Sequence, residues 1–105
     1  MSVNFRLTPD AKDDVLGIRQ HTVKQWGVEQ SNKYLQKLQE TIHLLTESPD
    51  IGVRRADIGE LVQSFPCQSH TIYHIQSDKN LVVFAVLHQS MVPASHLVDR
   101  SWRIS

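Results

Sequence analysis

Six histidines are the side chains with most potential for chemistry in this chain of 105 residues. His70 and His74 stand four residues apart, so in an extended strand their rings would lie on one face, where two imidazoles could bind a metal ion. A zinc site also needs further ligands, and no cysteine or carboxylate suitably accompanies this pair. We therefore predict no metal site and no cofactor, and expect surface or partly buried histidines.

The single cysteine, Cys67, precedes His70 by three residues, an arrangement in which a thiolate–imidazole pair would be a nucleophile. No orienting carboxylate lies nearby in the sequence, and a lone cysteine usually behaves as a small buried apolar residue. Catalytic triads, paired-carboxylate signatures and glycine-rich phosphate loops are absent, since the four glycines have no suitable spacing. These patterns favour a protein without catalytic residues of its own.

Two groups of cations remain as candidates for binding. Arg54 and Arg55 form an adjacent basic pair in a predicted loop, where they either bind an anion or are solvated. Near the C-terminus, Arg100, Trp102 and Arg103 combine cations with an aromatic ring, which suits stacking on a base or anchoring in a protein groove. The formal net charge of zero argues against binding that rests mainly on phosphate neutralisation.

Hydrophobic periodicity predicts the elements that position these residues. Residues 2–7 alternate as a half-buried strand does, and Thr8-Pro9-Asp10 has the residue types that begin a helix. That helix ends at Gly27, and a second helix of about twenty residues follows after a very short link, so the two pack as an antiparallel hairpin. The predicted apolar stripes are Ala11, Val15, Ile18, Thr22 and Trp26, and Tyr34, Leu35, Leu38, Ile42 and Leu45.

Strand signals dominate the rest of the chain. Residues 61–65 predict a short strand ending at Pro66, and residues 71–76 and 81–88 flank a turn at 77–80, giving a three-stranded antiparallel meander. The predicted fold class is therefore α+β, in the order β-α-α-β-β-β with a C-terminal tail, within one domain over residues 1–105. The N-terminus has no leader pattern and no segment is apolar enough to span a membrane, which favours the cytoplasm and no membrane contact.

The two faces of the predicted sheet follow from its register. If Gln76 faces Leu81, then one face carries an apolar set suited to receive the helical hairpin, and the other is also too apolar to be left in water. We expect the C-terminal segment, residues 93–105, or a partner protein to cover that second face. The first set is Thr71, Tyr73, Ile75, Val82, Phe84 and Val86, and the second is Ile72, His74, Val83, Ala85 and Leu87.

Several short motifs in a fixed order give the chain a family resemblance from about Phe5 to Leu97. It resembles the ParE branch of the RelE/ParE toxins, which includes plasmid stabilisation proteins. Single pieces are short, but their order and spacing together are specific. The matching pieces are Leu7-Thr8-Pro9-Asp10-Ala11, Gln25-Trp26-Gly27, Ala56-Asp57-Ile58, Ser64-Phe65-Pro66, His70-Thr71-Ile72-Tyr73 and Val86-Leu87-His88-Gln89.

The resemblance implies the toxin of a bacterial type II toxin–antitoxin module, held inactive by a small DNA-binding antitoxin that provides its only link to operator DNA. It also implies a poison of DNA gyrase, which stalls that enzyme on cleaved DNA and blocks replication. We expect an initially disordered antitoxin segment to dock along the helical hairpin and a sheet edge. The residues expected to contact the target are Arg54, Arg55, His88, Arg100, Trp102 and Arg103.

The C-terminus departs from the family pattern. Similar chains end soon after the segment matching 87–97, which is linked to toxicity, whereas here residues 98–105 extend it. This extension contacts gyrase, covers the open sheet face, or does neither.

The RelE branch of the superfamily, whose members cut mRNA on the ribosome, is the alternative. Cleavage of RNA needs cations and an acid or base at the scissile phosphate. The last two predicted strands hold no arginine or lysine, which argues against a ribonuclease, while Tyr73, His74 and His88 keep that alternative open. A third alternative is a module whose main role is a repressor complex with its antitoxin.

Overall fold

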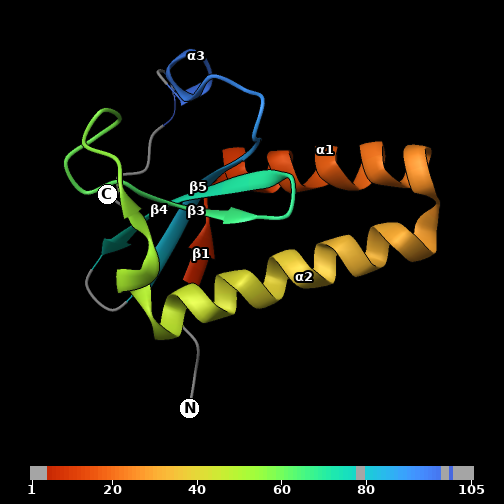
Figure 1. Ribbon diagram of the computed structural model, residues 1–105, viewed down its shortest axis with the longest axis horizontal. Helices are drawn as coiled ribbons and strands as arrows, with labels where there is room; N and C mark the ends of the chain where they lie inside the picture. The colour runs from red at the N-terminus through yellow and green to blue at the C-terminus, as the bar shows by residue number, and fades with distance from the viewer. Residues whose placement is uncertain (1–4, 78–79, 98–99, 101–105) are drawn as a thin grey trace.

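The computed structural model describes residues 5–77, 80–97 and 100 of the chain. Two long helices, α1 (Pro9–Trp26) and α2 (Val28–Glu47), pack on one face of a five-stranded sheet with the order β1-β5-β4-β3-β2 (Figure 1). A 3-10 turn, η1 (Pro49–Ile51), follows α2, and a short helix, α3 (Pro93–Leu97), lies at the opposite face. The α+β class is confirmed. The strands are β1 (Phe5–Leu7), β2 (Val53–Arg54), β3 (Gln63–Cys67), β4 (His70–Ser77) and β5 (Asn80–His88).

The helical hairpin forms as its capping residues predict. Thr8 Oγ1 accepts the Ala11 N–H at 3.2 Å, and Pro9 occupies the first turn, where its missing N–H is harmless. Gly27 alone joins the helices, with φ of 93°, a conformation that glycine adopts without the cost other residues meet. Across the hairpin, the hydroxyls of Thr22 and Ser31 are 2.7 Å apart in the core and fix the register of the two helices.

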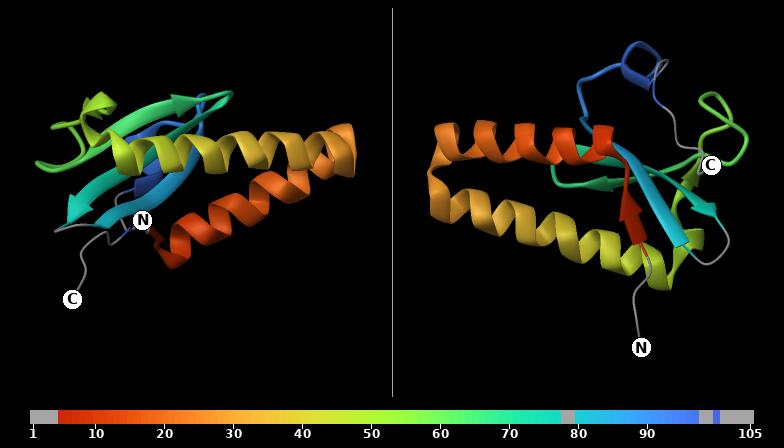
Figure 2. Two further views of the ribbon diagram at one scale, coloured as in Figure 1. Left: turned by 90° about the horizontal axis from the view of Figure 1, so that it is seen from below. Right: turned by 180° about the vertical axis from the view of Figure 1, so that it is seen from behind.

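The predicted meander of β3, β4 and β5 is present, and Gln76 faces Leu81 as expected. The N-terminal strand joins the far side of β5 in parallel, with Phe5 opposite Leu81, so the sheet is mixed (Figure 2, right). The strand predicted at residues 61–65 lies two residues later in the structure, as β3. Leu61 is 66% exposed outside it, and Pro66 lies within it, where β2 no longer pairs with β3 and a missing N–H is tolerated.

The predicted assignment of the two sheet faces was wrong. The hairpin packs on the face that carries Ile72 and Val83, while Tyr73 and Phe84 face away from it. The register shifts between Tyr73 and His74, so that Phe84 is an extra residue in β5 and Phe84 and Ala85 both face away from the helices. Alternation alone cannot predict such a bulge. The opposite face is covered by residues of this chain: Leu97 comes from the segment expected to cover a face, whereas Ile58 and Val62 come from the loop before β3, which was not expected to do so.

Trp26 does not belong to the core, contrary to the prediction from the helical stripe. Its side chain is 51% exposed and contacts the Tyr34 ring at 5.6 Å between centroids. The end of the hairpin around Gly27 extends beyond the sheet, so the last turn of α1 has nothing to pack on except α2 (Figure 1). Within the described residues, no helix is long and apolar enough to cross a membrane.

Candidate functional site

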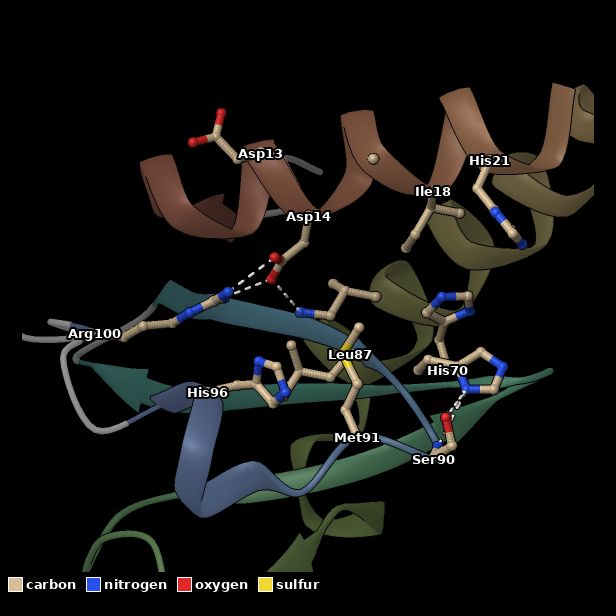
Figure 3. Close-up of a pocket in the computed structure, with 13 residues that line it drawn as sticks. Asp13, Asp14, Ile18, His21, His70, Leu87, Ser90, Met91, His96 and Arg100 are labelled. Carbon is tan, nitrogen blue, oxygen red and sulfur yellow. Dashed lines mark hydrogen bonds and ion pairs between the residues drawn. The ribbon is translucent and has the colours of Figure 1, made fainter. Parts of the chain in front are cut away.

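A cleft of about 510 Å³ opens where α1, the end of β5 and α3 meet. Four of the six histidines line it, together with two aspartates of α1 and an arginine beyond α3 (Figure 3). Residues far apart in the sequence thus meet at one edge of the sheet. These lining residues are His21, His70, His88, His96, Asp13, Asp14 and Arg100.

Asp14 and Arg100 form a bidentate ion pair at one end of the cleft. Arg100 Nη1 and Nη2 donate to the two carboxylate oxygens at 2.5 and 2.9 Å, and both side chains are more than four-fifths buried. Asp14 Oδ2 also accepts the Val86 N–H at 2.9 Å, and Arg100 Nη1 donates to the Phe84 carbonyl at 3.2 Å. The hydrogen bond to Asp14 raises the pKa of Arg100, so the cation is held and locally neutralised.

The histidines form a chain of aromatic contacts at the other end. Tyr34 Oη lies 2.6 Å from His70 Nδ1 and accepts the Ser69 N–H at 3.1 Å. The Tyr34 hydroxyl can therefore donate its proton to Nδ1 of a neutral His70 imidazole. The His70 and His88 rings meet edge to face at 5.3 Å. Burial, and then repulsion by His88 and His21, lowers the pKa of His70 to about 4, although Asp14 opposes this shift. His70 is therefore uncharged at neutral pH.

Of the residues predicted to contact a target, the cleft brings together only His88 and Arg100. Arg54 is exposed in β2, and Arg55 pairs with Asp57 at 3.0 Å while its guanidinium lies 5.7 Å from the Tyr73 ring centroid. Trp102 and Arg103 lie outside the described residues. The six predicted residues therefore do not form one cluster over the part of the chain that the structure describes.

The two histidine pairings considered from the sequence do not form. His74 is fully buried and neither ring nitrogen has a hydrogen-bond partner, whereas His70 bonds to Tyr34. Cys67 Sγ lies 3.3 Å from Thr41 Oγ1 in the core under α2. Over residues 5–77, 80–97 and 100, no three histidine, cysteine or carboxylate side chains are grouped so as to hold a metal ion.

Sequence reasoning missed Asp14, His21 and His96, and it did not foresee the role of Tyr34. Asp14 carried a usable signal, because it lies three residues after Ala11 and four before Ile18, on the buried stripe of α1. A carboxylate at such a position needs a partner. That partner, Arg100, is distant in the sequence, so the pair itself could not be read from local patterns.

Comparison with known proteins gives a consistent result. Residues 5–93 match the family model described as the ParE toxin of the type II toxin–antitoxin system parDE. Toxin ParE1 of Caulobacter vibrioides is 31% identical over 89% of this chain and 96% of its own length. Toxin ParE1 of Mycobacterium tuberculosis is 33% identical over 87% of this chain and 94% of its own. A solved chain of the chromosomal ParDE system of Pseudomonas aeruginosa superposes with a TM-score of 0.71 at 18% identity, covering 82% of this chain and 95% of that chain.

Proposed function

Because this chain belongs to the ParE toxin family of type II toxin–antitoxin systems, we propose that it inhibits DNA gyrase and is neutralised by a cognate antitoxin. The family assignment carries this proposal. Inhibition proceeds by binding: the toxin alters the strand-passage cycle of gyrase so that cleaved DNA accumulates, and the bond-breaking groups belong to gyrase. The toxin must then offer a shaped surface with fixed charges and needs no reactive group of its own.

The state of the described side chains supports binding over RNA cleavage. Tyr73 and His74 are both buried and face opposite sides of the sheet, so they do not converge with His88 on one substrate. Among the described residues that line the histidine cleft, Arg100 is the one arginine or lysine, and Asp14 already neutralises it. A scissile phosphate placed beside His70 and His88 would find no uncompensated guanidinium or ammonium there.

The proposed contacts with gyrase are His88 and Arg100 at the mouth of the cleft. Trp102 and Arg103, outside the described residues, stay proposed contacts on their residue types alone. The hydroxyl Oγ of Ser90 lies 2.7 Å from His88 Nδ1, and this hydrogen bond fixes the orientation of the imidazole at the rim of the cleft. Arg54 and Arg55 stay in the proposal as a second contact, since Arg54 is solvent-exposed. Substituting His88 and Arg54 separately distinguishes the two surfaces.

The antitoxin is proposed to dock along the helical hairpin. The outward faces of α1 and α2 carry large apolar side chains that the fold leaves exposed, with exposed fractions from 47% to 57%. An amphipathic segment that orders on binding would bury them and gain roughly 25 cal/mol for each Å² of apolar surface covered. These side chains are Leu16, Trp26, Val28 and Leu44.

A supercoiling assay with purified gyrase, relaxed plasmid and this protein tests the proposed activity. We expect loss of supercoiling together with linear DNA after detergent and protease treatment, and restoration of activity when the co-encoded antitoxin is added first. A matched reaction with translating ribosomes and mRNA tests the ribonuclease. Unchanged supercoiling and no cleaved plasmid would contradict gyrase inhibition, and cut mRNA in the second reaction would favour the alternative.

A further inference from the structure

The edge of β5 beyond β1 is closed by side chains instead of a strand. β1 pairs with β5 only as far as Leu7 opposite Val83, and the Thr8 N–H donates to the Val83 carbonyl at 3.0 Å. Past this point, the next outward groups of β5 are the Phe84 carbonyl and the Val86 N–H. The first accepts from Arg100 and the second donates to Asp14. The ion pair thus takes the place of a neighbouring strand.

This arrangement connects three segments through one carboxylate. Asp14 belongs to α1, Val86 to β5, and Arg100 follows α3, so the Arg100 side chain is held against the first helix as well as against the sheet (Figure 3). A largely buried bidentate pair has a fixed geometry that a solvated pair lacks. Residues 101–105 follow Arg100 directly in the sequence, and Trp102 and Arg103 are among them.

We propose that Asp14 is a positioning residue: it holds Arg100 on the β5 edge, in the position from which Arg100 contacts the target of the toxin. This inference rests on the proposed function for the identity of the target, but toxicity in cells tests it whatever the target is. Asp14 itself lies in the cleft wall and acts through Arg100. Loss of the pair frees the Arg100 side chain and removes the hydrogen bonds that Asp14 and Arg100 make to the β5 edge.

The first test is a trypsin digest, which needs no gyrase. Trypsin must take the Arg100 side chain into its own pocket, and the ion pair prevents this. In Asp14→Asn we expect the product ending at Arg100 to form about tenfold faster, measured by mass spectrometry against cleavage after the exposed Arg54 as internal reference. A variant that merely unfolds would accelerate both cleavages together. An unchanged ratio of the two cleavage rates would overturn the inference that Asp14 holds Arg100 in place.

The second test is growth arrest on induction, run beside the supercoiling assay. Asp14→Asn and Arg100→Gln should each reduce toxicity about tenfold, and the double variant should lose no more than either single variant, because both remove the same pair. Glu47→Gln is the matched control, since Glu47 is an exposed carboxylate at the end of α2 and does not line the cleft. We expect this control to keep both full toxicity and the wild-type trypsin ratio.

The outcomes separate this inference from the proposed function. A wild-type protein that arrests growth but leaves gyrase unaffected would contradict gyrase as the target, and the variants would still test the positioning role in cells. Full toxicity of Asp14→Asn with faster cleavage after Arg100 would overturn the positioning role while leaving gyrase inhibition intact. A double variant whose loss of toxicity is the product of the two single losses would overturn the requirement for pairing.

Discussion

His74 is expected to make the fold sensitive to acid. The imidazole is fully buried, and neither nitrogen has a hydrogen-bond partner among the described residues. An added Cβ at Gly52 would lie 3.0 Å from the ring, so the backbone of that loop closes tightly over it. Burial lowers the pKa of His74 from 6.5 to about 4. Between these two values the unfolded chain binds a proton that the folded chain does not, so stability falls as the pH falls.

The magnitude follows from the two pKa values. Lowering the pH from 7.5 to 5 should remove about 2 kcal/mol of unfolding free energy through His74 alone. Replacement by leucine, which is similar in volume and has no polar atoms, should abolish this contribution and leave stability at pH 7.5 equal or higher. His70 remains in both proteins, so its own contribution cancels in the comparison.

Urea denaturation of the wild type and His74→Leu at the two pH values, followed by far-UV circular dichroism, measures this difference. The wild type should lose about 2 kcal/mol more than the variant on acidification. His96→Gln is the control, because His96 is exposed on α3, and it should show the acid sensitivity of the wild type. Equal losses in the wild type and His74→Leu would refute the reasoning.

Two further predictions concern the hairpin and the cleft. Tyr34→Phe removes the hydroxyl that bonds both His70 and the Ser69 N–H, and should cost about 1–3 kcal/mol in urea denaturation at neutral pH; an unchanged midpoint would contradict a structural role for that hydroxyl. Gly27→Ala places a side chain at φ of 93° and should cost about 1 kcal/mol or more, with a lower thermal midpoint and an unchanged far-UV spectrum; equal stability would mean that the link relaxes.

Local signals predicted the parts of the fold that are local. The proline and threonine that begin α1, the glycine between the helices and the turn between β4 and β5 each act over a few residues. The predicted hairpin and the register of Gln76 against Leu81 therefore agree with the structure. The two sheet faces were exchanged because both are apolar, so alternation alone does not tell which one receives the hairpin. The bulge at Phe84 then places Val86 on the helix side and Ala85 and Leu87 on the other.

The candidate site was less predictable because it is assembled from distant residues. Arg100 and His88 were selected for their chemical types. Arg100 pairs with Asp14 of α1, and the His88 ring meets His70 of β4, which itself bonds to Tyr34 of α2. For Trp26 the local pattern was clear, but it did not determine burial. Its place on the helical stripe indicates which side of α1 it occupies, but the length of the sheet decides whether anything lies there to bury it.

The parallel pairing of β1 with β5 has a consequence for how this protein is made. Synthesis produces Phe5 early and Leu81 late, yet the two lie opposite each other in the finished sheet. The helical hairpin can form while translation continues, but its supporting sheet cannot close until β5 has left the ribosome. A nascent chain stalled before residue 81 should therefore show helical structure without the protease resistance of the complete fold. The toxin therefore cannot reach its folded form during synthesis until β5 has been made and can pair with β1.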